Sequence, residues 1–417
     1  MEIRHIAGLV VITISLFLPI AGRAQDSDAL SLQSVISLAE QKNYRLLALR
    51  RETEAAKARS WTTWWLADPS LSVEWEGVPS GAGLSAYGER RLTFSQEFEF
   101  PLNMYWQNRL ATQRVETAVM RYAQGRAAVR KQAIIAYTHY LAVLENIALT
   151  KQQVQLAQYF LETAVIRRNA GEAPALEVAR AQVEVARAEN ELYSMESEHV
   201  ATLATLNAVL GHDPDHKISS LDSLVYRRYN VALDSLKQLA VVVHPLLGET
   251  AARVRAANQL RKLAWGSLFP SIEFSVFRQN IGGNPDFYGM EIGLKIPLWF
   301  AFRQRGKIKE ASAMLSAHTH RHNAAELSLL AEIEHTYAAF TAARQQAEIY
   351  REKLLAPANE VYRITRRSYE SGESNYLQLL ESQQTLIEVH VGHIAVLANY
   401  YIAIAALEKA GSMTIIK

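Results

Sequence analysis

The sequence predicts a mainly α-helical protein with a small β part, arranged as two tandem repeats of helix-helix-strand-strand-helix-helix. Three observations lead to this fold class. Short motifs recur at a constant distance of 201 residues. Two helical stretches each run for more than 60 residues with almost no Gly or Pro. Between the helices lie short segments in which polar and apolar residues alternate, as on a strand with two different faces.

The repeat extends over most of the chain. Pro69 and Pro270 are 201 positions apart, and "DPSLSVEWEG" after the first helical pattern corresponds to "FPSIEFSVFR" after a later one. The same shift, over some 140 positions, pairs Leu38 with Leu239, Trp64 with Trp265, Gly171-Glu172 with Gly372-Glu373, Leu176 with Leu377 and Gln182 with Gln383. We therefore divide the chain into a first unit at residues 25–211 and a second unit at residues 212–417.

Residues 1–24 are expected to be a secretory signal peptide. Arg4 precedes a long apolar run, and Gly22 and Ala24 provide a small-x-small cleavage site. The alternative, an uncleaved anchor, would need about 20 apolar residues to cross a bilayer. Beyond this region no apolar run of about 18 residues appears, so no transmembrane helix is expected. The formal net charge of +2 does not indicate a nucleic-acid partner, and with no cysteine the chain has neither disulfides nor metal-thiolate sites.

Hydrophobic periodicity and breaker residues place the elements of each unit. The first unit has predicted helices at about 31–41 and 44–67, strands at 70–78 and 90–100, a helix at 102–168, a turn at "RNAGEAP" and a helix at 174–210 that ends at Gly211. The second unit has a predicted helix at 245–267, strands at 270–278 and 288–298, a helix at 301–370, a turn at "ESGES" and a helix at 374–410.

The long helix at 102–168 would measure about 100 Å at the usual rise per residue. The two shorter helices of the unit together hold 61 residues, so stacked end to end they would nearly match it. A tube of packed helices satisfies these lengths, although a plain antiparallel coiled coil would have the same composition. Pro357 is expected to break the second long helix. It is either a hinge that lets the helix end swing open or a kink without a gating role.

The strands indicate a membrane protein. A half-buried sheet in a soluble domain gives the same alternation, but segments of about 9–11 residues are long enough to cross a bilayer as tilted strands. Aromatic residues gather where strands meet helices, which is typical of a membrane–water boundary; they are Trp61, Trp64, Trp65, Tyr105, Trp106, Trp265, Trp299 and Phe300. The lipid-facing candidates are Leu92, Phe94, Phe98, Ile272, Phe274, Met290, Ile292 and Leu294. The lumen-facing candidates are Glu74, Glu97, Glu291 and Lys295.

The small number of strands implies that a barrel would need strands from more than one chain. Open sheet edges are not tolerated in lipid, and small closed barrels need about eight strands or more. The chain offers four predicted strands. If these strands span a membrane, several chains must contribute to one barrel.

Taken together, the tandem repeat, the element order and the "x-x-G-E" turn before each last helix resemble the TolC family of outer-membrane efflux channels. The segment "FSQEFEFPLNMYWQNRLA" resembles the branch that serves heavy-metal pumps of the resistance-nodulation-division type. The resemblance implies a homotrimer in the outer membrane, with a 12-stranded β-barrel that continues into a long α-helical periplasmic barrel. It also implies a passive duct that works with a periplasmic adaptor (membrane fusion) protein and an inner-membrane resistance-nodulation-division pump. Many relatives of the metal branch carry a lipid-modified cysteine, which this chain lacks.

The resemblance places the constriction of the duct at the turns between the helices. Glu370 and Glu373 are then candidates for a cation-attracting periplasmic aperture, because charged rings select ions in pores; as solvated residues at a helix end they would have no such role. Candidates for adaptor contact are Arg167, Gly171, Arg367 and Gly372.

No pattern of residues predicts catalysis or a bound cofactor. Ser, His and Asp occur without a nucleophile motif. His318 and His322 lie four apart on one helix face, as in metal-binding pairs, but no carboxylate or cysteine nearby completes a site. A periplasmic coiled-coil adaptor or structural protein that bridges the membranes is the alternative function. Such an adaptor should have one hairpin flanked by β-domains, whereas this chain has two predicted hairpins and few strands.

Overall fold

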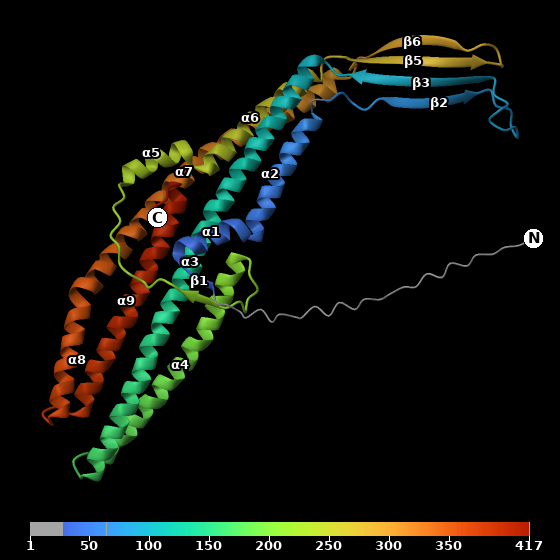
Figure 1. Ribbon diagram of the computed structural model, residues 1–417. Coiled ribbons are helices and arrows are strands. Elements are labelled where there is room, and N and C mark those ends of the chain that lie inside the picture. Colours follow the sequence, from blue (N-terminus) through green and yellow to red (C-terminus); the bar gives the residue numbers. More distant parts are fainter. Residues whose placement is uncertain (1–27, 64, 417) are drawn as a thin grey trace, which may run out of the picture.

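The chain folds into an elongated, mainly helical body with a four-stranded sheet at one end and two helical hairpins at the other (Figure 1). The computed structural model describes residues 28–63 and 65–416. The expected signal peptide and Trp64 lie outside the described residues.

The first half contains β1 (Asp28–Leu30), α1 (Leu32–Lys42), α2 (Tyr44–Thr62), β2 (Ser70–Glu76), β3 (Glu89–Phe98), α3 (Pro101–Asn169) and α4 (Ala175–Leu210). Local sequence explains several of these boundaries. Ser31 and Ser34 form a capping box at the start of α1, and Pro101 occupies the first turn of α3, where its missing N–H costs nothing. Gly211 ends α4 at a left-handed φ of 73°.

The second half contains β4 (Ile218–Ser220), α5 (Leu233–Val243), α6 (Pro245–Gly266), β5 (Ser271–Ile281), β6 (Phe287–Lys295), the π-helix η1 (Phe300–Gln304), α7 (Arg305–Ile349), the π-helix η2 (Tyr350–Leu354), α8 (Leu355–Glu370) and α9 (Tyr376–Gly411). After the β1–β4 pair and its connection, the order helix-helix-strand-strand-helix-helix follows that of the first half, with the long helix divided into segments.

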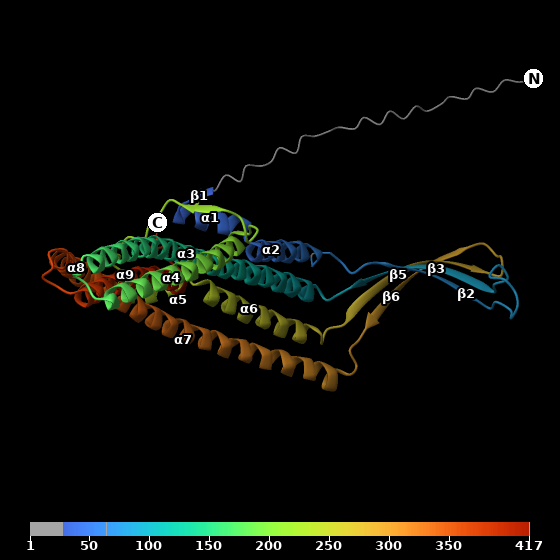
Figure 2. The same ribbon diagram turned by 90° about the horizontal axis from the view of Figure 1, so that it is seen from below.

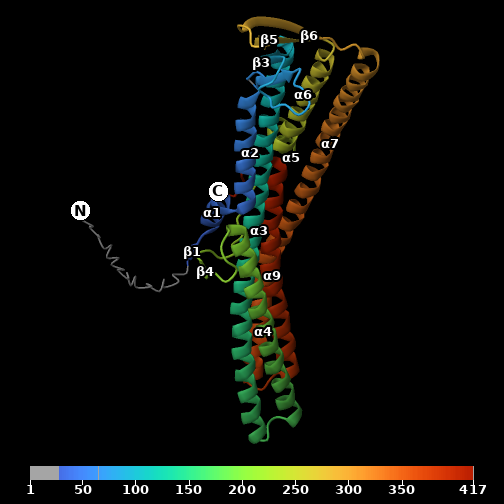
Figure 3. The same cartoon turned by 90° about the vertical axis from the view of Figure 1, so that its right-hand side faces the viewer.

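The longest helices, α3 and α7, organise the packing of the other helices. Along α3, α2 packs beside its sheet-proximal part and α4 beside its distal part, so the two shorter helices follow one another along the longer one (Figure 3). In the second half, α6 packs beside α7 and α9 lies beside both α7 and α8. Figure 2 shows the sheet extending from the helical body as a separate blade. The predicted stacking of helices is therefore confirmed.

The four-stranded sheet has the order β2-β3-β5-β6, and all neighbouring strands are antiparallel. Leu92 lies opposite Val73 on one side and opposite Arg278 on the other. The central pair β3–β5 therefore joins the two halves of the chain, and β2 and β6 are the edges.

A buried carboxylate connects α6 to α3. Glu249 is 6% exposed and accepts hydrogen bonds from Arg121 Nε at 2.9 Å and Gln124 Nε2 at 2.6 Å. Arg253, one turn further along α6, forms a second ion pair with it. Burial by itself would raise the pKa of the Glu249 carboxyl, but these donors outweigh it and lower the pKa below its ordinary value.

Two apolar helices pass a composition test for membrane spans. One stretch of 18 residues in α3 and one in α9 are apolar enough on average to cross a bilayer. No such helix was expected from the sequence, because that expectation rested on uninterrupted apolar runs. Of these stretches, 56% in α3 and 44% in α9 is buried inside the chain. Ala133, Ile134 and Tyr137 of α3 and Leu397 and Tyr400 of α9 supply this core. Packing against neighbouring helices accounts for the buried part of these stretches.

The structure differs from the predicted elements at three places. The helix predicted at 44–67 ends earlier, at Thr62, with Thr63 as its C-cap. The helix predicted at 301–370 is divided by two π-helices, and the second division, at Tyr350–Leu354, comes before Pro357. The short parallel pair β1–β4 was missed, because three-residue strands have too little pattern to be recognised. The helix α5 was also missed.

Candidate functional site

The strand register places all four charged lumen candidates on one face of the sheet. Residues directly opposite one another in an antiparallel pair share a face, as do alternate residues along a strand. Glu74 lies opposite Arg91, and Glu97 lies opposite Glu273. Glu291 lies opposite Ser275, and Lys295 lies opposite Ser271. We call this surface the charged face.

Near the helical body, an ion-pair group connects three strands on the charged face. Lys295 Nζ lies 2.9 Å from Glu97 Oε2 and 3.3 Å from Glu273 Oε2. Ser271 donates its hydroxyl to Glu97 Oε1 at 2.8 Å. The lysine partly neutralises two carboxylates, so this part of the face has a net negative charge.

An aromatic side chain also occupies the charged face, and sequence reasoning missed it. Phe277 lies under the guanidinium of Arg91, whose Cζ is 4.9 Å from the ring centroid. Gly289 is directly opposite, and a Cβ there would come within 2.3 Å of the ring. The glycine on the neighbouring strand was the available signal, since it makes room for a large cross-strand partner.

The opposite face of the sheet is mainly apolar and uncovered in the single chain. Its polar members include Gln96 and Arg278, and Arg278 forms an ion pair with Asp286. All eight lipid candidates lie on it by the same register. Met290 is 70% exposed, Ile292 68% and Leu294 59%. Soluble monomers rarely leave so continuous an apolar surface in water, and such a surface marks contact with a membrane or a partner.

At the far end of the molecule, both hairpin turns have the same backbone geometry. Gly171 has φ 75° and Gly372 has φ 82°, a conformation that favours glycine. The N–H of Glu172 donates to the carbonyl of Arg167 at 2.9 Å, and the N–H of Glu373 donates to the carbonyl of Ser368 at 2.8 Å. These bonds close the last helical turn, as in a Schellman motif.

The two hairpins are joined near their turns by one polar contact. The Tyr369 hydroxyl of α8 donates to Glu177 Oε1 of α4 at 2.6 Å. The Arg167 guanidinium lies 3.6 Å from the same carboxylate and 4.9 Å from the Tyr369 ring centroid. Tyr369 is 3% exposed, and its burial together with the bond to Glu177 raises the pKa of its hydroxyl to about 12. We call Arg167, Glu177 and Tyr369 the tip contact.

The remaining turn candidates are at the surface. Glu370 forms an ion pair with Arg366 at 3.6 Å, and Glu373 and Arg367 are exposed. Arg167 differs from them, because it is held in the tip contact. Sequence reasoning missed Glu177 and Tyr369, which are 192 positions apart and carry no local pattern that would link them.

The two histidines of α7 have separate surroundings. His322 Nδ1 lies 2.8 Å from the Thr250 hydroxyl of α6. For His318, burial and the nearby cations Arg321 and Arg253 lower the pKa. Among residues 28–63 and 65–416, no group of three or more His, Cys, Asp or Glu has a geometry that could hold a metal ion.

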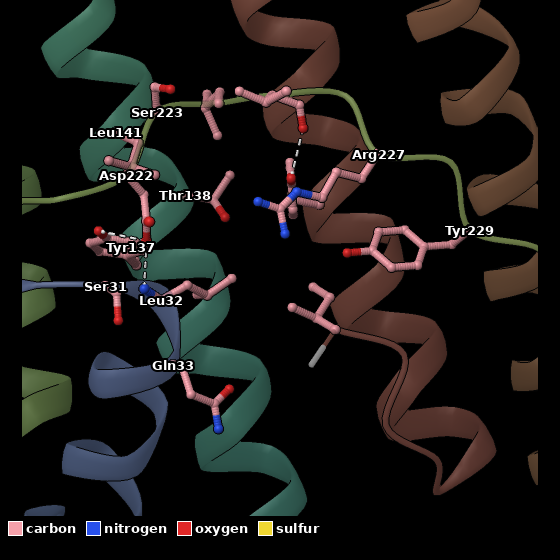
Figure 4. Close-up of a pocket in the computed structure, with 14 residues that line it drawn as sticks. Ser31, Leu32, Gln33, Tyr137, Thr138, Leu141, Asp222, Ser223, Arg227 and Tyr229 are labelled. Atoms are coloured by element: carbon pink, nitrogen blue, oxygen red, sulfur yellow. Dashed lines mark hydrogen bonds between the residues drawn. The ribbon is translucent and has the colours of Figure 1, made fainter.

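A crevice at the middle of the molecule is lined by the start of α1, by α3 and by the segment that connects the two halves (Figure 4). Asp222 accepts the backbone N–H of Leu32 at 2.6 Å, and the Tyr137 hydroxyl donates to the carbonyl of Leu30 at 2.7 Å. Tyr229 and Arg227 border the crevice from the same connecting segment. These contacts attach the start of α1 and the segment between the two halves to α3.

Comparisons with known proteins identify the family. The sequence profile described as "Outer membrane efflux protein" matches residues 35–212 and 236–411. The cobalt-zinc-cadmium resistance protein CzcC of Cupriavidus metallidurans is similar at 21% identity over 388 residues, 91% of this chain and 89% of the relative. The pyoverdine export outer membrane protein OpmQ of Pseudomonas putida is 22% identical over 286 residues, 66% of this chain and 59% of the relative.

Solved structures share the fold. The outer membrane channel CmeC of Campylobacter jejuni has a TM-score of 0.79 at 16% identity, covering 91% of this chain and 85% of that chain. CusC has a TM-score of 0.77 at 13% identity and covers 92% of both chains. A membrane protein from Pseudomonas aeruginosa has a TM-score of 0.76 at 19% identity, covering 93% and 95%. The profile matches most of the chain and describes outer membrane efflux proteins, which decides against the adaptor alternative. It does not describe an enzyme family. The chain belongs to the outer membrane efflux protein family.

Proposed function

We propose that three copies of the chain form a passive exit duct, the outer-membrane component of a tripartite efflux pump. The observation that supports this most directly is a sheet with one exposed apolar face, one charged face and two open edges. An open edge in lipid would leave backbone N–H and C=O groups unpaired. Edge pairing between copies removes this cost.

The strand directions allow such a closure. Because β2, β3, β5 and β6 alternate in direction, β6 of one copy meets β2 of the next in an antiparallel pair. Three copies then give a ring of 12 strands, enough for a barrel with a polar interior. The charged face, with Glu74, Glu97, Glu291 and Lys295, lines the lumen, and the apolar face contacts lipid.

The helices continue the barrel as a periplasmic tube. Residues 25–211 and 212–417 are two copies of one structural unit, so three chains contribute six similar units to the wall. The matching turn geometry at Gly171 and Gly372 supports this division. Residues 1–24 direct export and are removed.

The helical tips are the periplasmic entrance. Glu370 and Glu373 form a cation-attracting aperture. Gly171, Gly372, Arg167 and Arg367 provide the contact with a periplasmic adaptor protein, which connects the duct to an inner-membrane resistance-nodulation-division pump. Arg167 presents only 26% of its side chain to solvent, so we expect Arg367 to contribute more to this contact. Heavy-metal cations are the proposed cargo, in line with the name of the relative CzcC.

Membrane fractionation and cysteine labelling test the proposal together. The mature protein should fractionate with the outer membrane and, once extracted in detergent, have the mass of three chains. In single-cysteine variants Glu97→Cys and Phe94→Cys, a membrane-impermeant thiol reagent should reach position 97 and spare position 94. Recovery as a soluble protein, or equal labelling at both positions, would refute the proposal.

A further inference from the structure

Where the helices meet the sheet, the molecule carries a concentrated positive charge. The helix segments next to the sheet are residues 53–62 of α2, 101–114 of α3, 257–266 of α6 and 300–310 at the start of η1 and α7. They contain ten basic residues and two acidic ones, Glu54 and Glu310, in a chain with an overall formal charge of +2. The ten basic residues, which we call the basic collar, are Lys57, Arg59, Arg109, Arg114, Arg261, Lys262, Arg303, Arg305, Lys307 and Lys309.

The charges of the collar are available to a partner. Nine of the ten side chains are exposed, and Arg261 is half-buried. The ion pairs of the described residues do not include any of the ten, whereas Arg121, Arg126 and Arg130 further along α3 each pair with a carboxylate. Two acidic residues of the strand–helix connections, Asp68 and Glu99, line a hollow beside the ends of α2 and α3, where Glu99 accepts from Gln107 at 2.8 Å. With these two counted, ten basic residues stand against four acidic ones. The collar therefore keeps its positive charge.

Aromatic side chains lie among the basic residues. Trp61 is 75% exposed, Tyr105 53%, Trp265 53%, Phe300 59% and Phe302 80%. Such rings favour the headgroup level of a bilayer. Arg109 donates to the Tyr105 hydroxyl at 3.1 Å and keeps its charge. Exposed rings and cations without a carboxylate partner thus lie directly next to the apolar face, as headgroups lie next to acyl chains in a lipid leaflet.

The direction of the helices brings the cations closer to the sheet. In an α-helix each side chain leans toward the N-terminus. Both α3 and α7 begin at the sheet, so Arg109, Arg114 and the cations of α7 lean toward it. Long basic side chains also extend along apolar surface to place their charge at a membrane interface.

We propose that the basic collar binds the headgroups of anionic phospholipids in the leaflet that faces the periplasm. This inference rests on the proposed insertion of the strands in a membrane and adds a preferred lipid class. Charge complementarity supports the assignment, since basic clusters next to a membrane segment attract acidic lipids. The attraction is electrostatic, so it weakens as salt concentration rises.

The start of α7 offers a matched pair of variants. Residues four positions apart lie on the same face of a helix, and residues two positions apart lie on opposite faces. Arg303 and Lys307 therefore share one face of this segment, and Arg305 and Lys309 share the other. In a tubular assembly one of these faces is directed outward to lipid and the other is not. The double variants Arg303→Gln/Lys307→Gln and Arg305→Gln/Lys309→Gln remove the same charge from the two faces.

The experiment uses the full mature chain, reconstituted into vesicles of phosphatidylethanolamine with or without added phosphatidylglycerol. After mild detergent extraction, the ratio of phosphatidylglycerol to phosphatidylethanolamine that remains with the protein is measured at low and high salt. The wild type should retain phosphatidylglycerol preferentially, and high salt should reduce the preference. One double variant should lose most of it, since the attraction corresponds to about fivefold in binding for each cation near the surface. The other should resemble the wild type.

The outcomes separate this inference from the proposed function. If the wild type does not enter vesicles of either kind, the proposed membrane insertion itself fails. If the wild type enters both but retains the two lipids equally, or if neither double variant changes the ratio, the collar is not a lipid site. A change in the ion selectivity of conductance, with the lipid ratio unchanged, would assign the cations to the lumen and overturn the inference.

Discussion

The tip contact gives a quantitative prediction about how firmly the two hairpins hold together. Tyr369→Phe removes one hydroxyl and keeps the buried ring, so it deletes the 2.6 Å bond to Glu177 with little change in packing. A hydrogen bond to a charged acceptor contributes about 1.5–3 kcal/mol. Glu177 is 11% exposed as a side chain, so water replaces the lost donor poorly. The local opening equilibrium of the tips should therefore shift by about ten- to a hundred-fold.

Hydrogen exchange of the assembled protein in detergent measures this opening. Amides in residues 160–180 and 365–380 should exchange faster in Tyr369→Phe than in the wild type, while amides of α2 and α6 stay unchanged. Tyr159→Phe, at an exposed tyrosine of α3, is the control and should leave exchange at the tips as it is. The pKa of Tyr369 is raised to about 12, so the contact should persist below its ordinary pKa of about 10 and be lost as the pH rises toward 12.

A double-mutant cycle decides whether the hydrogen bond is the cause. Glu177→Gln combined with Tyr369→Phe should cost less than the sum of the two single changes, with a coupling energy of about 0.5–3 kcal/mol. Additive effects would mean that the two side chains act independently. Unchanged exchange in Tyr369→Phe would refute the reasoning, and core packing around Phe160 and Leu379 would then be what holds the hairpins together.

Three further predictions concern the aperture, the sheet and the helical body. Replacing both Glu370 and Glu373 by Gln should lower cation selectivity in planar-bilayer conductance, and unchanged selectivity would leave them as ordinary residues at a helix end. Phe94→Lys should impair trimer assembly, because a charge on the lipid face costs about 2–4 kcal/mol, whereas Thr93→Lys on the charged face should assemble normally on native gels. Glu249→Gln should destabilise the protein by about 1.5–3 kcal/mol, since its two arginine partners lose their carboxylate. The lowered pKa of Glu249 means that this stability is present above its ordinary value of 4.5 and lost as the pH falls below it, so thermal unfolding of the variant should depend less on acid.

The sequence alone determined most of the element order and the character of the four long strands. Alternation of polar and apolar residues has a period of two, so it assigns each side chain of a strand to a face before the neighbours of that strand are known. The placement of Glu97 on one face and Phe94 on the other followed from this rule. The long helices were equally readable, because runs with almost no Gly or Pro, ended by Gly171, Gly211 and Gly372, leave few other conformations.

Only the tertiary structure decided which distant residues meet. The pairing of β3 with β5, the tip contact between Glu177 and Tyr369, and the basic collar each combine parts of the chain that are far apart in sequence. A local pattern gives only the conformational preference of its own segment. These contacts depend instead on how long, rigid helices are placed side by side, such as α3 with its 69 residues. The position of the break in the second long helix also depends on tertiary contacts. Pro357 predicted an interruption, but the π-helix lies before it, at Tyr350–Leu354. There the Tyr350 hydroxyl packs against Gly392 of α9.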